Sequence, residues 1–538
     1  MNRKLTTITL VSLIAFLPIT FSQAAGVPDE QYLPPNSTLS DATGIWFEDN
    51  IDITRMPSIL YSYKGQYVSS FCNGLDDPAC VNSDRFYYVS LLPKCISESS
   101  VDCIESLYAI NSATPVKIQG SLDYILPTTV SKKFKGDVAI GLPEGSNSGV
   151  WTLPGVLNKA GTDKYVVIVS RAGNLNKLGT TSLQSMGFGD FRAGIFPVSI
   201  IKDAAYRSNI ANIRDQTSLG VEIQHPSQKE FRICAIVADG ICASRQGFPD
   251  DTQFGLRIRL SKPMTGWVHG RIESPIVDYQ TKSYGSSIDI QGYPTKVPMF
   301  DGWVSQSSLT QNQKDELLGN GSTARSGSQL APLLYGESSM KQLGAWAKVL
   351  GDKATAMPTQ WIFHTLSDYE MQGANRCITT STKLAGLVST NSTTYSAGPP
   401  VFNKEDQTLD YKVASPHLDA KGEVFKGSYD LYIDENVARC IYGFSSAPVS
   451  ATVSIVSSDG KTQVATTTLT TGSGWLHLSA KGFTFSNPTL KVKLTQEGSV
   501  PVKDVSRPTP ATKKITCIKG KVSKVVTTAT CPAGYKKK

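Results

Sequence analysis

Residues 254–260, FGLRIRL, alternate apolar side chains with glycine and arginine at every position. Successive side chains of a β-strand point to opposite faces, so this stretch predicts a strand with one apolar and one basic face. The segment GWVHGRI (residues 266–272) follows after Pro263 and is predicted to be its antiparallel partner. The centre of the chain is therefore predicted to be β-structure.

The same alternation recurs towards the C-terminus. It is present in GSYDLYI (residues 427–433), in residues 449–455 and in residues 490–494. Short strands that are separated by turns about every 8 to 12 residues are typical of all-β sandwiches. This part of the chain is therefore predicted to be sandwich-like.

Helical patterns are confined to residues 308–351. Thr310 and Gln313 have the spacing of a capping box, which predicts the start of a first helix. A second helix is predicted to place on one apolar face Met340, Leu343, Ala347 and Leu350. Its expected N-cap is Ser338 or Ser339.

The predicted fold class is mainly β: several antiparallel, sandwich-like domains, a short helical insert and disulfide staples. A chain of 538 residues exceeds the size of a single core. The predicted segments are a signal peptide (1–24), an N-terminal disulfide-containing domain (25–126), a central β domain (127–307), a helical segment (308–359), a C-terminal β-sandwich-like region (360–500), a proline-rich linker (501–512) and a basic, disulfide-clamped tail (513–538).

The first residues have the pattern of a secretory signal peptide. Arg3 and Lys4 precede an apolar run over residues 10–19, and small residues at 22 and 24 predict cleavage after Ala24 or Ala25. The run is shorter than the about 20 apolar residues that a membrane helix needs, although an uncleaved anchor or a buried helix remains an alternative. No later segment has the pattern of a membrane span, so we expect an exported protein, free in the medium or associated with the cell surface.

The cysteine spacing predicts disulfide bonds. An even number of cysteines in an exported chain indicates paired thiols, and three times a cysteine is followed by another eight residues later across turn-forming residues. The predicted pairs, in sequence order, are Cys72–Cys80, Cys95–Cys103, Cys234–Cys242, Cys377–Cys440 and Cys517–Cys531. A crossed pairing such as Cys72 with Cys103 is the alternative. No spacing typical of a zinc site is present, and no cysteine is left over as a nucleophile.

Basic residues collect at the C-terminal end. The net charge is +8, yet the rest of the mature chain is close to neutral because residues 507–538 contain no Asp or Glu. The lysines expected to contact a surface are Lys513, Lys514, Lys519, Lys521, Lys524, Lys536, Lys537 and Lys538. A nucleic-acid-binding body would spread its basic residues over one face, so we expect anionic cell-envelope polymers as partners rather than nucleic acid. A solvated tail is the alternative, but it would not explain Cys517 and Cys531.

Several stretches near the C-terminus resemble known sequences. They are ARCIYGFSSAPVSATVSIVSSDG (residues 438–460), GWLHLSAKGFTF (474–485), LKVKLTQ (490–496), ITCIKGK (515–521) and CPAGYKKK (531–538). They are similar to segments that recur in exported, uncharacterised proteins of Gram-positive actinobacteria. The resemblance covers roughly the last 120 residues, with a weaker internal echo at residues 266–272. It implies a bacterial, exported, modular protein, and it implies no reaction and no catalytic residues.

Motifs for enzymatic chemistry are missing from the sequence. It contains no G-x-S-x-G, no H-E-x-x-H, no Walker A and no dinucleotide fingerprint, so neither a cofactor nor a metal is expected. The five histidines are His225, His269, His364, His417 and His477. His269 and His477 lie in strand-like stretches near tryptophans, which indicates structural rather than acid–base roles.

Scattered carboxylates leave one enzymatic alternative open. A glycosidase uses two carboxyl groups about 5 to 9.5 Å apart. The candidates are Asp76, Asp77, Asp250, Asp251 and Glu273. The four aspartates lie in stretches typical of solvated turns, and no EF-hand spacing supports calcium. The sequence therefore favours a non-catalytic binding or structural protein of the envelope, with a secreted carbohydrate-active hydrolase as the alternative. It does not indicate an oligomeric state.

Overall fold

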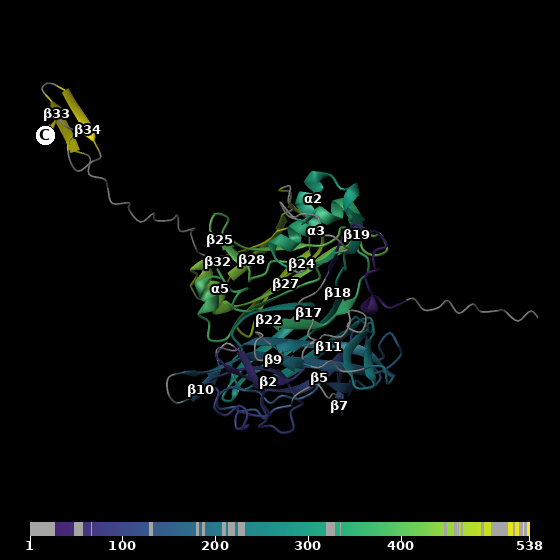
Figure 1. Ribbon diagram of the computed structural model, residues 1–538. Helices are drawn as coiled ribbons and strands as arrows, with labels where there is room; N and C mark the ends of the chain where they lie inside the picture. The colour runs from purple at the N-terminus through teal and green to yellow at the C-terminus, as the bar shows by residue number, and fades with distance from the viewer. Residues whose placement is uncertain are drawn as a thin grey trace, which may run out of the picture.

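The computed structural model describes residues 27–47, 57–65, 67–127, 133–178, 182–185, 189–206, 211–213, 221–223, 232–318, 329–333, 335–445, 449–456, 460, 462–463, 466–485, 489–496, 515–519, 522–526, 531 and 535–537 (Figure 1). The predicted signal peptide, the linker over 501–512 and His225 lie outside these residues. Within the described ranges, no helix combines the length and the apolar character needed to cross a bilayer.

One long sheet runs through the middle of the molecule. Its strands, in spatial order, are β3 (Tyr67–Phe71), β2 (Ile59–Lys64), β4 (Arg85–Leu91), β9 (Lys164–Leu178), β11 (Asp190–Lys202), β22 (Ile362–Thr365), β17 (Gly266–Lys282), β23 (Leu384–Thr390), β27 (Lys426–Asp434), β31 (Trp475–Thr484) and β30 (Thr466–Gly472). Neighbours are antiparallel except β17 and β23, which are parallel. The prediction of a mainly β, largely antiparallel fold is confirmed.

A second sheet covers one face of this central sheet. Its strands are β6 (Lys117–Gln119), β5 (Cys103–Asn111), β16 (Thr252–Leu260), β18 (Gly285–Lys296) and the C-terminal half of β17, with β21 (Thr359–Gln360) on the end of β18. The apolar core between the two sheets includes Leu256 and Ile258 of β16.

One predicted pairing is wrong. Residues 254–260 form most of β16 and residues 266–272 begin β17, but these strands are not neighbours, because β18 lies between them. The turn at Lys282–Gly285 folds β18 back along β17, and the other edge of β18 then pairs with β16. The first half of β17 is held instead in the central sheet, between β22 and β23.

A third sheet covers the opposite face of the central sheet. Its strands are β24 (Thr394–Tyr395), β26 (Thr408–Ala414), β32 (Thr489–Gln496), β28 (Val449–Val456) and β29 (Thr462–Gln463), with β25 (Val401–Asn403) on β26. Helices α4 (Arg376–Thr379) and α5 (Glu435–Tyr442) contribute Ile378 and Val437 to the same core. The described chain is therefore layered around one central sheet.

The central sheet is buried on both faces. In β9, Tyr165, Val167 and Val169 belong to the core under the second sheet, and Val166 and Ile168 belong to the core under the third. Every residue of β23 is buried. Strands covered on both sides consist of apolar runs rather than an alternation, which explains the run at residues 165–169.

The helical insert packs on a small sheet. Strand β1 (Ala42–Phe47) lies between β19 (Asp301–Ser305) and β20 (Gln329–Leu333), and its core includes side chains of α2 (Gln311–Leu318) and α3 (Glu337–Leu350). The capping box of α2 is confirmed: the backbone N–H of Thr310 donates to Gln313 Oε1 (2.9 Å), and that of Gln313 donates to Thr310 Oγ1 (3.3 Å).

The expected serine N-cap of α3 is wrong. The helix begins at Glu337, and Gly336 is the N-cap residue. Its φ of 90° lies in a region that favours glycine, and its N–H donates to the carbonyl of Tyr395 (2.6 Å). This left-handed turn starts the helix before Ser338.

The remaining elements lie at the edges of the layers or apart from them. They are η1 (Asp29–Gln31), η2 (Gln306–Ser308), β7 (Ser121–Ile125), β8 (Gly149–Thr152), β10 (Ser182–Ser185), β12 (Ala211–Ile213), β13 (Val221–Ile223), β14 (Cys234–Ala238), β15 (Ile241–Arg245), β33 (Ile515–Lys519), β34 (Val522–Val526) and β35 (Lys536–Lys537).

The expected domain boundaries do not separate sheets. Strand β4, from the segment 25–126, pairs with β9 from the segment 127–307. Strand β17 pairs with β22 and β23, which come from the segment 360–500. Three of the predicted segments therefore contribute strands to the same central sheet.

Four of the predicted disulfides are confirmed. Their Cα–Cα distances are 5.9 Å for Cys72–Cys80, 5.0 Å for Cys95–Cys103, 5.4 Å for Cys234–Cys242 and 5.9 Å for Cys377–Cys440. The crossed alternative, Cys72 with Cys103, is thereby excluded. Cys531 is also disulfide-bonded, and the side chain of Cys517, its expected partner, lies outside the described residues.

Replacing Gly386 by alanine should destabilise the protein. A Cβ atom there would clash with the ring of Trp267 and lie 2.6 Å from the carbonyl oxygen of Tyr432. Overpacking of this kind typically costs about 1–3 kcal/mol. Urea unfolding should show a lower midpoint for Gly386→Ala, whereas Gly472→Ala, which meets no atom within 4 Å, is the matched control. Equal midpoints for the two variants would contradict the close packing at β23.

Removing a disulfide should destabilise the protein more when the bond closes a longer loop. The Cys377–Cys440 bond spans 63 residues and Cys234–Cys242 spans 8. The chain-entropy relation gives roughly 4 and roughly 2.6 kcal/mol for such loops. The double variant Cys377→Ser/Cys440→Ser should therefore unfold at lower urea than Cys234→Ser/Cys242→Ser. The reverse order would show that loop length does not govern these two contributions.

Candidate functional site

The C-terminal lysines lie partly on a small sheet. Strand β33 is in the middle, with β34 on one edge and β35 on the other, and no pairing joins them to the other described strands. Lys519, Lys536 and Lys537 are exposed, and Lys536 lies opposite Ile518 in the register. Lys524 is in β34, but its side chain is not described, and Lys513, Lys514, Lys521 and Lys538 lie outside the described residues.

Three of the five candidate carboxylates share one groove. It lies where β16, β17 and β18 meet the loop before β16, and its lining includes Asp250, Asp251, Glu273, Tyr293, Lys296 and Asn391. We call this the carboxylate groove, and its volume is about 460 Å³. Asp76 and Asp77 do not line it. This grouping could not be predicted from sequence patterns, because only the order of the strands in space brings the contributing segments together.

Asp77 is held in a turn, as its sequence context predicts. Its carboxylate accepts from the backbone N–H of Asn73 (2.9 Å) and of Ala79 (3.0 Å). These hydrogen bonds hold the pKa of the Asp77 carboxyl below its usual value. The carboxylate therefore closes the loop between Cys72 and Cys80.

Two of the three carboxylates of the groove accept hydrogen bonds from lysines. Asp250 forms an ion pair with Lys159, which holds the pKa of the Asp250 carboxyl below its usual value. Glu273 accepts from Lys481 Nζ (3.1 Å). A glycosidase needs one carboxyl group with a raised pKa as its general acid. The pKa of the Asp250 carboxyl is shifted the opposite way, so Asp250 itself does not fit the role of the general acid.

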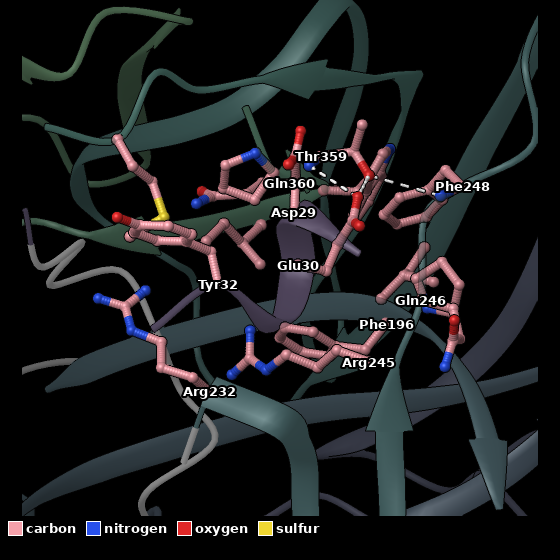
Figure 2. A pocket seen from close by; sticks show the side chains of 16 residues that line it. Asp29, Glu30, Tyr32, Phe196, Arg232, Arg245, Gln246, Phe248, Thr359 and Gln360 are labelled. Carbon is pink, nitrogen blue, oxygen red and sulfur yellow. Dashed lines mark hydrogen bonds between the residues drawn. The ribbon is translucent and has the colours of Figure 1, made fainter. Parts of the chain in front are cut away.

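A second cavity lies under the N-terminal segment (Figure 2). Glu30 Oε1 accepts from the backbone N–H (3.1 Å) and the hydroxyl (2.6 Å) of Thr359, and Tyr32 donates to Asp301 Oδ2 (3.1 Å). The cavity volume is about 50 Å³, room for a few waters at most. These contacts fix the N-terminal segment to the body and leave no room for a larger ligand.

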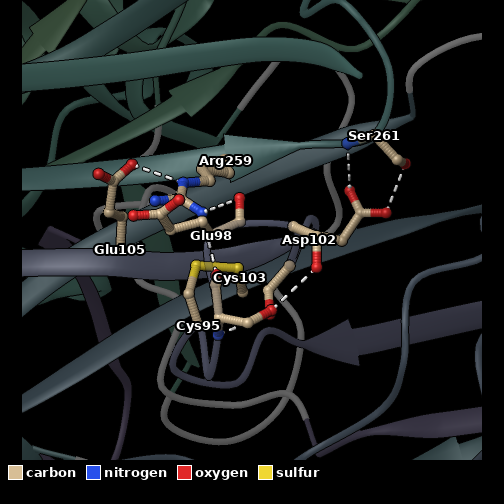
Figure 3. The surroundings of a disulfide bond; sticks show 10 residues. Cys95, Glu98, Asp102, Cys103, Glu105, Arg259 and Ser261 are labelled. Carbon is tan, nitrogen blue, oxygen red and sulfur yellow. Dashed lines mark hydrogen bonds and ion pairs between the residues drawn. A yellow bond between two sulfur atoms is a disulfide. The ribbon is translucent and has the colours of Figure 1, made fainter. Parts of the chain in front are cut away.

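The loop of Cys95–Cys103 is tied to the end of β16 (Figure 3). Asp102, with a φ of 50°, accepts from the backbone N–H (3.0 Å) and the hydroxyl (2.5 Å) of Ser261. Arg171 Nη1 lies 3.4 Å from the same carboxylate, and both side chains are buried. A buried ion pair of this kind is sensitive to loss of either partner, so we assign it a structural role.

Two histidines face each other inside the molecule. His269 of β17 lies opposite His364 of β22, with ring centroids 5.9 Å apart, and His269 Nε2 lies 3.2 Å from the hydroxyl of Tyr411. Burial, and then Arg271, lowers the pKa of His269 to about 3. Burial, and then His269, lowers the pKa of His364. Both rings are therefore neutral at physiological pH, and the sequence did not reveal their pairing.

The other described histidines have hydrogen-bond partners. His477 Nε2 lies 2.9 Å from Asp430 Oδ1, and its ring stacks on Tyr432 with centroids 4.1 Å apart. His417 Nδ1 lies 3.3 Å from the carbonyl oxygen of Phe485. Among the described residues, no group of three or more His, Cys, Asp or Glu side chains is arranged to hold a metal ion.

Comparisons with known proteins do not assign the chain to a family. No family model, curated protein or solved structure matches it.

The buried histidines should make the protein acid-sensitive. The unfolded chain binds protons at histidine near pH 6.5, whereas the folded chain keeps His269 neutral down to about pH 3. Each buried histidine therefore makes its full contribution to the free energy of unfolding above about pH 6.5. As the pH falls below this value, the free energy of unfolding decreases by up to about 1.4 kcal/mol per pH unit for each such histidine. Urea unfolding between pH 7 and pH 4 measures this slope.

The variant His364→Gln removes one titrating group and should flatten the slope. The matched control is His417→Gln, because His417 is only partly buried. Identical slopes in the wild type and in His364→Gln would show that the buried pair does not govern the acid sensitivity.

Proposed function

We propose that the chain is an exported, non-catalytic binding protein whose basic C-terminal sheet contacts anionic polymers of the cell envelope. The observation that carries the proposal is the exposure of Lys519, Lys536 and Lys537 on paired strands. Lysines on a sheet are held at fixed relative positions, unlike those of a solvated tail. By the strand register, Lys519 and Lys537 share one face of this sheet, so an anionic polymer would meet both cations at once.

Two further observations support the proposal. Disulfides persist in oxidising compartments and are rare in the cytosol, so four bonds favour an exported protein. Asp250 of the carboxylate groove is bound to Lys159 and its pKa is lowered, so it does not fit the role of a general acid in the hydrolase alternative.

Loss of the three exposed lysines should weaken binding to a polyanion. Each lysine near an anionic surface contributes roughly 1 kcal/mol, so Lys519→Gln/Lys536→Gln/Lys537→Gln should bind poly(glycerol phosphate) at least about tenfold more weakly. Co-sedimentation of the full chain with the immobilised polymer measures this. The interaction of the wild type should also weaken as salt rises, because the contact is screened.

The control is a variant with the same loss of charge elsewhere. Lys353, Lys404 and Lys421 are exposed on the body, and their replacement by glutamine should leave binding nearly unchanged. Equal weakening in the two triple variants would show that net charge, and not the C-terminal sheet, determines the contact. Salt-independent binding would likewise reject the electrostatic proposal.

A further inference from the structure

The carboxylate groove differs from the N-terminal cavity in size and in what its lining offers. Its volume of about 460 Å³ lies within the range of small-molecule sites, whereas the cavity under Glu30 is about 50 Å³. Thr252 and Asn391 are buried in its lining, and Asp250, Asp251 and Lys296 are exposed. The groove therefore presents several polar side chains at the edge of the second sheet.

The charges around the groove are balanced. Asp250, Asp251 and Glu273 contribute carboxylates, and Lys296 is a cation of the lining. Two further cations are bound directly to these carboxylates: Lys159 to Asp250 and Lys481 to Glu273. A balanced set gives no net field that would select a polyanion or a polycation. It suits a neutral ligand rich in hydroxyls, because each hydroxyl can donate to a carboxylate and accept from an ammonium group.

The groove also offers an apolar surface. Tyr293 is partly buried, and its hydroxyl lies 2.8 Å from Ser112 Oγ. Pro249 and Pro294, also partly exposed, belong to the same lining. An amphipathic ligand with C–H faces and hydroxyl edges can therefore meet apolar and polar groups together.

The backbone around the groove is fixed before any ligand arrives. The carbonyl of Asp251 accepts from the N–H (3.0 Å) and the hydroxyl (2.8 Å) of Ser112. The register of β17 against β18 shifts between Glu273 and Ile276, so Glu273 lies at the start of a β-bulge. Preorganised side chains lose less freedom on binding.

From the volume, the charge balance and the mixed lining, we propose that the carboxylate groove binds a neutral saccharide. The site is separate from the C-terminal sheet, and the proposal does not depend on the polyanion contact proposed above. The saccharide is held by hydrogen bonds to Asp251, Glu273 and Lys296, with a ring face against Tyr293.

Calorimetric titration of the full chain with maltohexaose, mannohexaose and chitohexaose tests the proposal. We expect saturable binding of at least one of these neutral oligosaccharides. Asp251→Asn should weaken that binding about tenfold, because it removes a charged acceptor. Asparagine tolerates the left-handed conformation of residue 251, where φ is 51°, so the variant keeps its fold. Tyr293→Ala should also weaken binding through loss of the ring.

The matched control is Asp278→Asn, an exposed carboxylate on the same strand as Glu273 but outside the groove lining. It should bind as the wild type does. Absence of saturable binding to all three oligosaccharides would overturn the proposal, as would equal affinity of Asp251→Asn, Tyr293→Ala and Asp278→Asn. The triple lysine variant of the C-terminal sheet should bind the oligosaccharide normally, which separates failure of this site from failure of the polyanion contact.

Discussion

The cover over both faces of the central sheet is the constraint on which the rest of the structure depends. Strands β9 and β23 have no face towards solvent over most of their length, so any polar side chain on them needs an internal partner. Arg271 on β17 meets this need by donating from Nη1 to the carbonyls of Thr390 (3.0 Å) and Ser392 (2.5 Å). The neutral histidine pair follows from the same burial.

The two-sided cover also explains where binding groups are found. Strand β17 is shared: its first half belongs to the central sheet and its second half to the covering sheet. The register shift after Glu273 lies where β17 passes from the central sheet into the second sheet. Glu273 at this transition is one of the charged residues that line the carboxylate groove.

Local patterns predicted the kind of structure but not its arrangement. Alternation at residues 254–260 predicted a strand, and the eight-residue cysteine spacing predicted three disulfides, because both depend on neighbours in sequence. The partner of β16 was not predictable in this way, since β5 lies more than a hundred residues earlier. The same holds for the groove, whose Asp251, Tyr293 and Asn391 meet only when three segments have been ordered in space. The start of α3 was missed because a backbone turn at Gly336, not a side chain, determines it.

Strand β1 lies between β19 and β20, so its small sheet can form only after these much later strands have been synthesised. Synthesis proceeds from the N-terminus, at roughly 5 to 20 residues per second, so β1 waits roughly 15 to 60 s before the residues of β20 exist. Until the residues of β19 have also been made, Trp46 and Phe47, which are buried in the folded protein, lack a partner strand on either edge of β1. The three-stranded sheet that supports α2 and α3 therefore cannot be completed before residue 333 has been added, although its central strand is the first to be made.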